Sequence, residues 1–78
     1  MSAFKAVTSR TLTLNVNGAA TEVPASAATV ADVVAALGLA GKRIAVEKNG
    51  EIVSRSRYAA TSIAPGDRLE IVGAVGGG

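Results

Sequence analysis

The chain has 78 residues, 49% of them hydrophobic and 18% charged, which is typical of one small globular domain. It contains no cysteine and no histidine, which excludes disulfides, thiolate metal sites and histidine-based catalysis. The formal net charge is +2, and Tyr58 and Phe4 are the only aromatic residues. Scattered charge without stacking aromatics is not typical of a nucleic-acid-binding protein.

Residues 1–10 carry no regular pattern, and we expect them to form a partly disordered N-terminal extension. They include one Lys and one Arg, but no apolar stretch of the signal-peptide kind follows. No apolar run in the chain approaches the roughly 20 residues that a membrane span needs. We therefore expect a cytoplasmic protein that binds no membrane, with a folded domain over residues 11–72.

The first regular pattern predicts a β-hairpin. Residues 11–16 alternate polar and apolar side chains, which is the period of a half-buried strand. Asn17-Gly18 follows and is the strongest short hairpin signal, because both turn positions favour positive φ. Residues 19–23 form the expected return strand, which Pro24 ends.

The next pattern predicts a short helix of about two and a half turns. Thr29 is a suitable N-cap, and Asp32 is its capping-box partner. Gly38 is placed for the left-handed position after the helix, with Leu39 folding back onto the last turn. Apolar residues fall on one face that must lie against a sheet, at Val30, Val33, Val34 and Leu37.

The second half of the chain predicts another hairpin and a last strand. Residues 44–46 and 52–53 flank an Asn49-Gly50 turn, whereas residues 54–64 show no clear period and are expected to wrap round the sheet edge. Pro65-Gly66 fits the centre of a type II turn before a strand over residues 68–72.

Two hairpins joined by a crossover helix predict an α+β fold of the β-grasp (ubiquitin-like) kind. We expect a mixed sheet of four to five strands with one main helix on one face. In such a fold the last strand lies centrally, beside the first strand and parallel to it. The expected core is Leu12, Leu14, Val16, Val30, Val33, Val34, Leu37, Ile44, Val46, Leu69 and Ile71.

The last six residues, 73–78, form a predicted flexible tail that ends in Gly76, Gly77 and Gly78. At an average glycine usage of about 7%, three glycines at one fixed place arise by chance about three times in ten thousand. A glycine tail without Cβ atoms can enter a narrow channel, and six extended residues reach about 20 Å. The alternative is a linker without function.

The residue inventory argues against an enzyme. Hydroxyls and lysines are the candidate nucleophiles, and no histidine is available to activate them. The six acidic residues show no metal-ligand spacing, and no phosphate-binding loop occurs. We expect neither a metal site nor a bound cofactor.

From Leu12 onward the sequence resembles the ThiS sulfur carriers of thiamine biosynthesis. The resemblance is densest in residues 52–58, in the Gly66-Asp67 turn and strand that follow, and in the terminal glycines. Ser54 and Tyr58 depart from it, because a proline and a tryptophan are frequent there. The family is related to the small subunit of molybdopterin synthase.

The resemblance implies a function for the chain end. An E1-like adenylyltransferase (ThiF type) would consume MgATP to adenylate the Gly78 carboxylate. A cysteine-desulfurase-derived sulfur donor would convert it to a thiocarboxylate, and thiazole synthase (ThiG type) would receive the sulfur. Gly76 and Gly77 would thread into the partner. The expected partner interface is Val72, Ala74 and Val75, with Arg55 and Arg57.

Three alternatives remain at this point. The small subunit of molybdopterin synthase has the same fold, terminal glycines and thiocarboxylate chemistry, but a different sulfur acceptor. A ubiquitin-like modifier would form an amide with target lysines after the same activation. A β-grasp interaction module would not use its tail.

Overall fold

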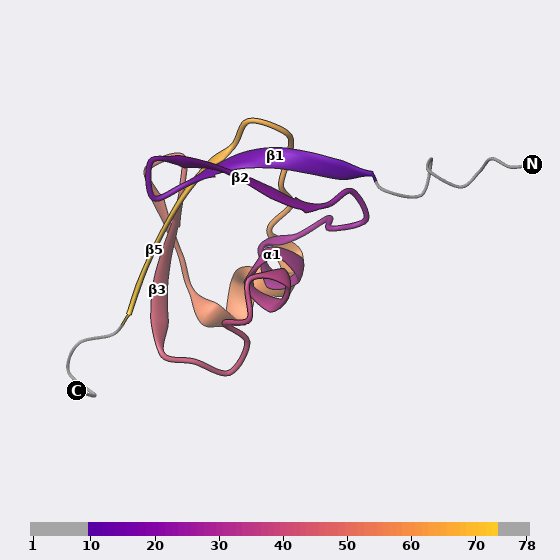
Figure 1. The fold of residues 1–78 in the computed structure, drawn as a ribbon. Helices are drawn as coiled ribbons and strands as arrows, with labels where there is room; N and C mark the ends of the chain where they lie inside the picture. The colour runs from indigo at the N-terminus through magenta and orange to yellow at the C-terminus, as the bar shows by residue number, and fades with distance from the viewer. Residues whose placement is uncertain (1–9, 74–78) are drawn as a thin grey trace, which may run out of the picture.

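The computed structural model describes residues 10–73, which form a five-stranded sheet with one α-helix against one face (Figure 1). The strand order is β2-β1-β5-β3-β4, with β1 and β5 parallel and the other neighbours antiparallel. The predicted mixed sheet with one main helix is thus confirmed. In chain order the elements are β1 (Thr11–Val16), β2 (Ala19–Pro24), α1 (Val30–Ala36), β3 (Ile44–Lys48), β4 (Glu51–Val53), the 3-10 helix η2 (Arg55–Ala60) and β5 (Arg68–Gly73).

Both hairpins turn at an Asn-Gly pair with positive φ at both positions. Asn17 and Gly18 have φ of 54° and 86°, and Asn49 and Gly50 have φ of 50° and 89°. This is the type I′ geometry, whose twist matches the right-handed twist of the flanking strands. Both predicted hairpins are confirmed.

The turn before β5 also has the predicted geometry. Gly66 has φ of 86°, and the Asp67 N–H donates to the Ala64 carbonyl over 3.1 Å, which closes a turn with Pro65 and Gly66 at its centre. Positive φ at the third position is the requirement of a type II turn, which a glycine meets without strain.

Helix α1 begins with the predicted capping box. The Asp32 N–H donates to Thr29 Oγ1 over 3.3 Å, and the Asp32 carboxylate accepts from the Thr29 N–H over 3.1 Å. The same carboxylate accepts from the Ala28 N–H over 2.8 Å. Backbone donors at the helix start, which have no partner within the helix, are thereby satisfied.

Helix α1 ends in a Schellman motif. The Gly38 N–H donates to the Ala35 carbonyl over 3.0 Å, and the Leu39 N–H donates to the Val34 carbonyl over 2.9 Å. Gly38 takes the left-handed conformation, with φ of 76°. The helix spans seven residues, about two turns and so slightly shorter than predicted, because Leu37 is already its C-cap.

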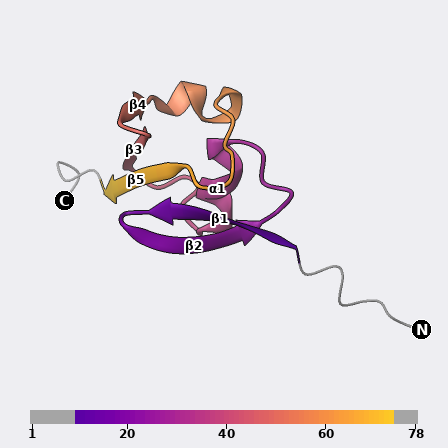
Figure 2. The same cartoon turned by 90° about the horizontal axis from the view of Figure 1, so that it is seen from above.

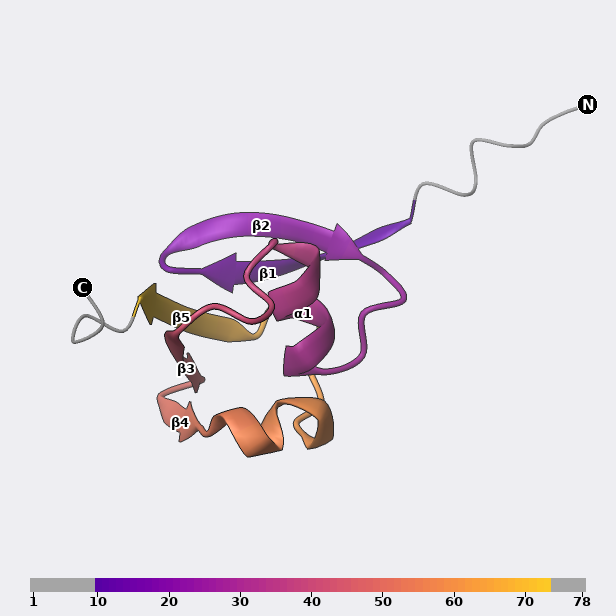
Figure 3. The same cartoon turned by 90° about the horizontal axis from the view of Figure 1, so that it is seen from below.

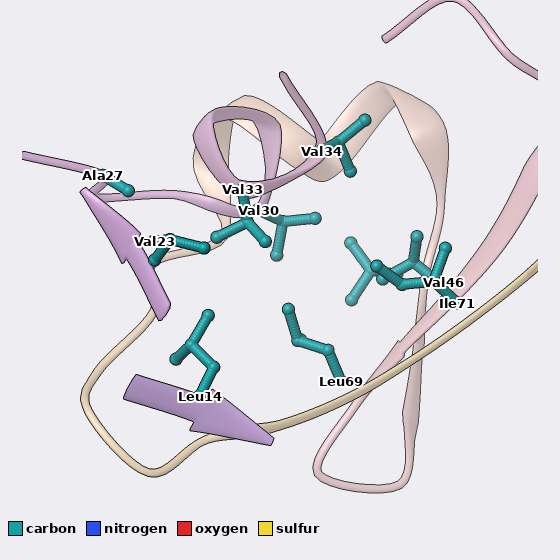
Figure 4. Packing of buried hydrophobic residues seen from close by; sticks show 10 residues of the cluster. Leu14, Val23, Ala27, Val30, Val33, Val34, Val46, Leu69 and Ile71 are labelled. Atoms are coloured by element: carbon teal, nitrogen blue, oxygen red, sulfur yellow. The ribbon is translucent and has the colours of Figure 1, made fainter. Parts of the chain in front are cut away.

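One hydrophobic core lies between α1 and the sheet (Figure 4). Four residues of the expected core, Leu12, Val16, Leu37 and Ile44, are only half-buried and pack at its margin. The core also contains three residues that were not predicted, Val23, Ala27 and Val53. β2 and β4 each place a single large apolar side chain on this face, which is too few to show a period, and Ala27 lies in a loop. The buried set is Leu14, Val23, Ala27, Val30, Val33, Val34, Val46, Val53, Leu69 and Ile71.

The segment without a predicted period contains the 3-10 helix η2, which follows β4 at the opposite edge of the sheet from β2 (Figure 3). This short 3-10 helix was not predicted, and α1 remains the one main helix that was. None of the η2 residues is buried, so the core still lies beneath α1 alone. Tyr58 and Ile63 are partly buried and pack against the margin of the core.

Truncation of the buried Leu69 should lower the stability much more than truncation of an exposed residue. Leu69 is 0% exposed in β5, and Leu69→Ala is expected to lower the free energy of unfolding by about 2–4 kcal/mol. Ile52→Ala is the matched control, because Ile52 is 81% exposed and its truncation should cost less than about 0.5 kcal/mol. Urea unfolding measures both, and equal losses would contradict the described core.

Acidification should weaken the start of α1 through Asp32. Hydrogen bonds from the backbone of Ala28 and then of Thr29 hold the pKa of Asp32 below its ordinary value of 3.8. A carboxyl with a lowered folded-state pKa contributes stability above its unfolded pKa, and loses it as the pH falls through the folded one. The difference in Tm between the wild type and Asp32→Ala should therefore shrink as the pH falls below 3.8. A constant difference would contradict this role.

Candidate functional site

The candidate site is the end of the sheet at which β5 leaves the domain. β5 lies between β1 and β3, which is the predicted central place, and it runs one residue further than expected, to Gly73 (Figure 2). There Val72 pairs with Ala45 and Gly73 pairs with Ile44, the first residue of β3. Pairing with β3 anchors the strand up to this point. Five expected site residues, Ala74, Val75, Gly76, Gly77 and Gly78, lie outside the described residues.

Val72 presents an aliphatic side chain on the outer face of the sheet. Leu69 and Ile71 alternate with it along β5 and are buried beneath α1, so Val72 points to the opposite face. It is 58% exposed, and the facing Ala45 is also exposed. Ile52 is the other exposed large aliphatic residue in the described part of the chain, and the sequence did not mark it as exposed.

The two arginines of η2 lie toward opposite ends of the sheet. Arg55 donates from Nη2 to the Lys42 carbonyl over 3.3 Å, and it lines a hollow together with Lys42 and Ile44. Because Ile44 pairs with Gly73, this hollow lies at the end where β5 leaves. Arg57 lines a different hollow.

That second hollow lies beside the β3–β4 turn. Lys48, Asn49 and Ile52 line it together with Arg57. Asn49 donates its backbone N–H to the Arg68 carbonyl over 2.7 Å, which places this turn at the start of β5. The structure therefore brings Arg55, and not Arg57, to the sheet end that carries Val72.

Two further basic residues lie at the exit end, and the sequence-based prediction missed both. Lys42 and Arg43 directly precede β3 and are exposed. Within residues 10–73 the structure records one ion pair, between Lys48 and Asp67 at 3.9 Å, so neither residue has a carboxylate partner there. The available signal was that Lys42-Arg43 is the only adjacent pair of basic residues in the chain.

Reactive groups are few in the described structure. Within residues 10–73 no group of three or more acidic residues is placed to hold a metal ion. No helix of that part is long and apolar enough to cross a membrane. What the exit end does offer is a surface, with the aliphatic Val72 on the sheet and three cations, Lys42, Arg43 and Arg55, around the start of β3.

Comparison with known proteins gives consistent matches. The model of the ThiS family matches residues 9–78. The sulfur carrier protein ThiS of Bacillus subtilis strain 168 is 35% identical over 65 residues, covering 83% of this chain and 98% of that protein. A thiazole synthase of Paramagnetospirillum magneticum is 46% identical over 50 residues, 64% of this chain, and the match covers only 15% of that protein.

A solved structure is similar over most of the chain. The crystal structure of the thiamine biosynthesis protein (ThiS) from Geobacter metallireducens superposes with a TM-score of 0.72 at 33% identity. The likeness covers 86% of this chain and all of that one. It confirms the predicted fold.

Proposed function

The chain belongs to the ThiS family, and we propose that it is a sulfur carrier in thiamine biosynthesis. The observation that carries the proposal is the family match, which spans residues 9–78 and so includes the terminal glycines. The names of the similar proteins favour the thiamine pathway over molybdopterin synthesis.

The proposed chemistry takes place at the Gly78 carboxylate. An E1-like adenylyltransferase of the ThiF type binds MgATP, the carboxylate attacks the α-phosphorus, and pyrophosphate leaves. The acyl adenylate is an activated acyl group, so hydrosulfide supplied by a cysteine-desulfurase-fed donor can attack its carbonyl carbon, form the C–S bond and displace AMP. Gly78 then carries a thiocarboxylate. The chain is a protein co-substrate of these enzymes and not an enzyme itself.

The proposed sulfur acceptor is thiazole synthase of the ThiG type. A thiazole synthase that contains a segment 46% identical to 50 residues of this chain supports this assignment. Thiazole formation needs a sulfur nucleophile, and a thiocarboxylate supplies one that the side chains of this protein lack, since the chain has no cysteine.

The exit end is the proposed docking surface for these partners. Val72 supplies apolar area next to the tail, and Ala74 and Val75 continue the apolar sequence. Arg55, with the neighbouring Lys42-Arg43 pair, favours a partner whose surface is acidic at this place. Docking here offsets the cost of ordering the tail in a partner's channel, about 1–2 kcal/mol per residue.

Changes at the tail should abolish loading without affecting the fold. Deletion of Gly77-Gly78 removes the reacting group, and one Ala appended after Gly78 displaces the carboxylate by about 3.5 Å. Gly77→Val adds side-chain atoms where the channel admits none. All three should lose ATP–pyrophosphate exchange with the adenylyltransferase, while the free energy of unfolding changes by less than about 0.5 kcal/mol.

A chain with one Ala added before Met1 is the control for these tail variants, and it should support normal exchange. Normal exchange by all three tail variants would mean that the tail is a linker, and the sulfur-carrier proposal would fail.

Charge reversal on η2 should distinguish the two ends of the sheet. Arg55→Glu places a negative charge at the exit end and should raise the KM for the carrier about fivefold, with a larger effect at low salt. Arg57→Glu makes the same change two residues away, toward the other end, and should leave the KM within about twofold. Equal effects of the two substitutions in the same exchange assay would argue against docking at the exit end.

A further inference from the structure

The parallel pairing of β1 with β5 ends well before β5 does. Its register covers Asn15 with Arg68 and Val16 with Leu69, and the Asn17 N–H adds one bond to the Leu69 carbonyl over 2.9 Å. The chain then turns at Gly18 into β2. No backbone group of β1 therefore pairs with Ile71.

The side chain of Asn17 takes the place of the missing strand residue. Its Oδ1 accepts from the Ile71 N–H over 2.8 Å, and its Nδ2 donates to the Ile71 carbonyl over 2.9 Å. The two residues are 54 positions apart, and both bonds are partly buried. A primary amide carries one acceptor and a donor, as a backbone peptide does, whereas an ionised aspartate could only accept.

Ile71 lies near the end of β5, close to the point at which the tail begins. Ile71 is the last core residue of β5, and only Val72 and Gly73 follow it before the tail. On the other side of the strand, β3 pairs with β5 up to Gly73. The Asn17 side chain thus supplies the last recorded bonds on the β1 side of β5, where the chain is about to leave the sheet.

We infer that Asn17 is a positioning residue, which fixes the place and direction in which β5 delivers the tail to the adenylyltransferase. This inference rests on the proposed function. Without the two side-chain bonds, the end of β5 is held from one side only and can pivot about its pairing with β3. Ile71 lies two residues before the end of β5, so the direction of the strand there sets where the tail starts relative to the docking surface. Displacement of a reacting atom by about 1 Å can slow a reaction up to about a hundredfold.

Asn49 is a matched control, because its side chain makes the same kind of hydrogen bond to the other end of β5. It occupies the same position in the other type I′ turn, with φ of 50°, and its Oδ1 accepts from the Arg68 N–H over 2.9 Å. Its Nδ2 also donates to Asp67 Oδ1 over 3.2 Å. Asn49 therefore holds the start of β5, as Asn17 holds its end. Asn17→Gly and Asn49→Gly each remove one side-chain amide, and both keep a residue that tolerates positive φ.

Hydrogen exchange tests the contact without any partner enzyme. The Ile71 amide should exchange about tenfold faster in Asn17→Gly than in Asn49→Gly, because only the first variant removes its acceptor. Equal exchange at Ile71 in the two variants would overturn the inference, whatever the protein carries.

Kinetics then tests positioning. In ATP–pyrophosphate exchange, Asn17→Gly should lower kcat about tenfold and leave the KM for the carrier within about twofold, because the docking surface is intact. Asn49→Gly should change neither value by more than about twofold. A variant that was merely less stable would lower the concentration of folded carrier, and so raise the apparent KM at unchanged kcat.

The outcomes separate the inference from the function on which it rests. Equal kinetics for the two variants, or an effect of Asn17→Gly on KM alone, would overturn the positioning role while the wild type remained a carrier. Failure of the wild type to support exchange would instead overturn the proposed function, and with it the positioning role, leaving the Ile71 exchange rates to decide the structural contact.

Discussion

The pairing of β5 on both sides is the constraint on which the rest of the structure depends. Each hairpin by itself is a two-stranded ribbon, which is marginally stable in water. β5 joins them, because it pairs with β1 of the first hairpin and with β3 of the second. Its inward residues Leu69 and Ile71 then complete a surface wide enough for α1 to cover. One strand thus turns two weak units into a single sheet with one core.

Successive residues of β5 point to opposite faces of the sheet, so one set of side chains forms the core and the other set lies on the outer surface. Residues that point toward α1 are buried, and the alternate residues, which include Val72, remain available on the outer face. Pairing with β3 up to Gly73, together with the Asn17 side chain at Ile71, holds the end of β5 as the chain leaves the domain.

The two Asn-Gly turns show how much one residue type can contribute in a domain of 78 residues. Asparagine tolerates the left-handed conformation that the first turn position needs, and this role is local. Each of these asparagines also uses its side-chain amide to bond the backbone of β5, Asn49 at the start of the strand and Asn17 near its end. On the β1 side of Ile71, the Asn17 amide stands where no backbone group of β1 pairs.

Most of the elements could be predicted because their causes lie within a few residues of each other. The Thr29–Asp32 cap, the left-handed Gly38 and both Asn-Gly turns depend on local backbone preferences. Alternation along 11–16 and 68–72 likewise identified the inward residues. The 3-10 helix η2 escaped prediction because its short i→i+3 turns bury no face and so leave no period in the sequence.

The contacts at the site could not be predicted in this way, because they join residues that only the strand order brings together. Arg55 and Arg57 are equivalent in the sequence, yet the path of η2 sends the first toward Lys42 and the second toward the β3–β4 turn. The bonds between Asn17 and Ile71 span 54 residues and exist because β5 lies beside β1. Local preference specifies a turn at Asn17, but a partner for its side chain appears only when a distant strand is placed against it.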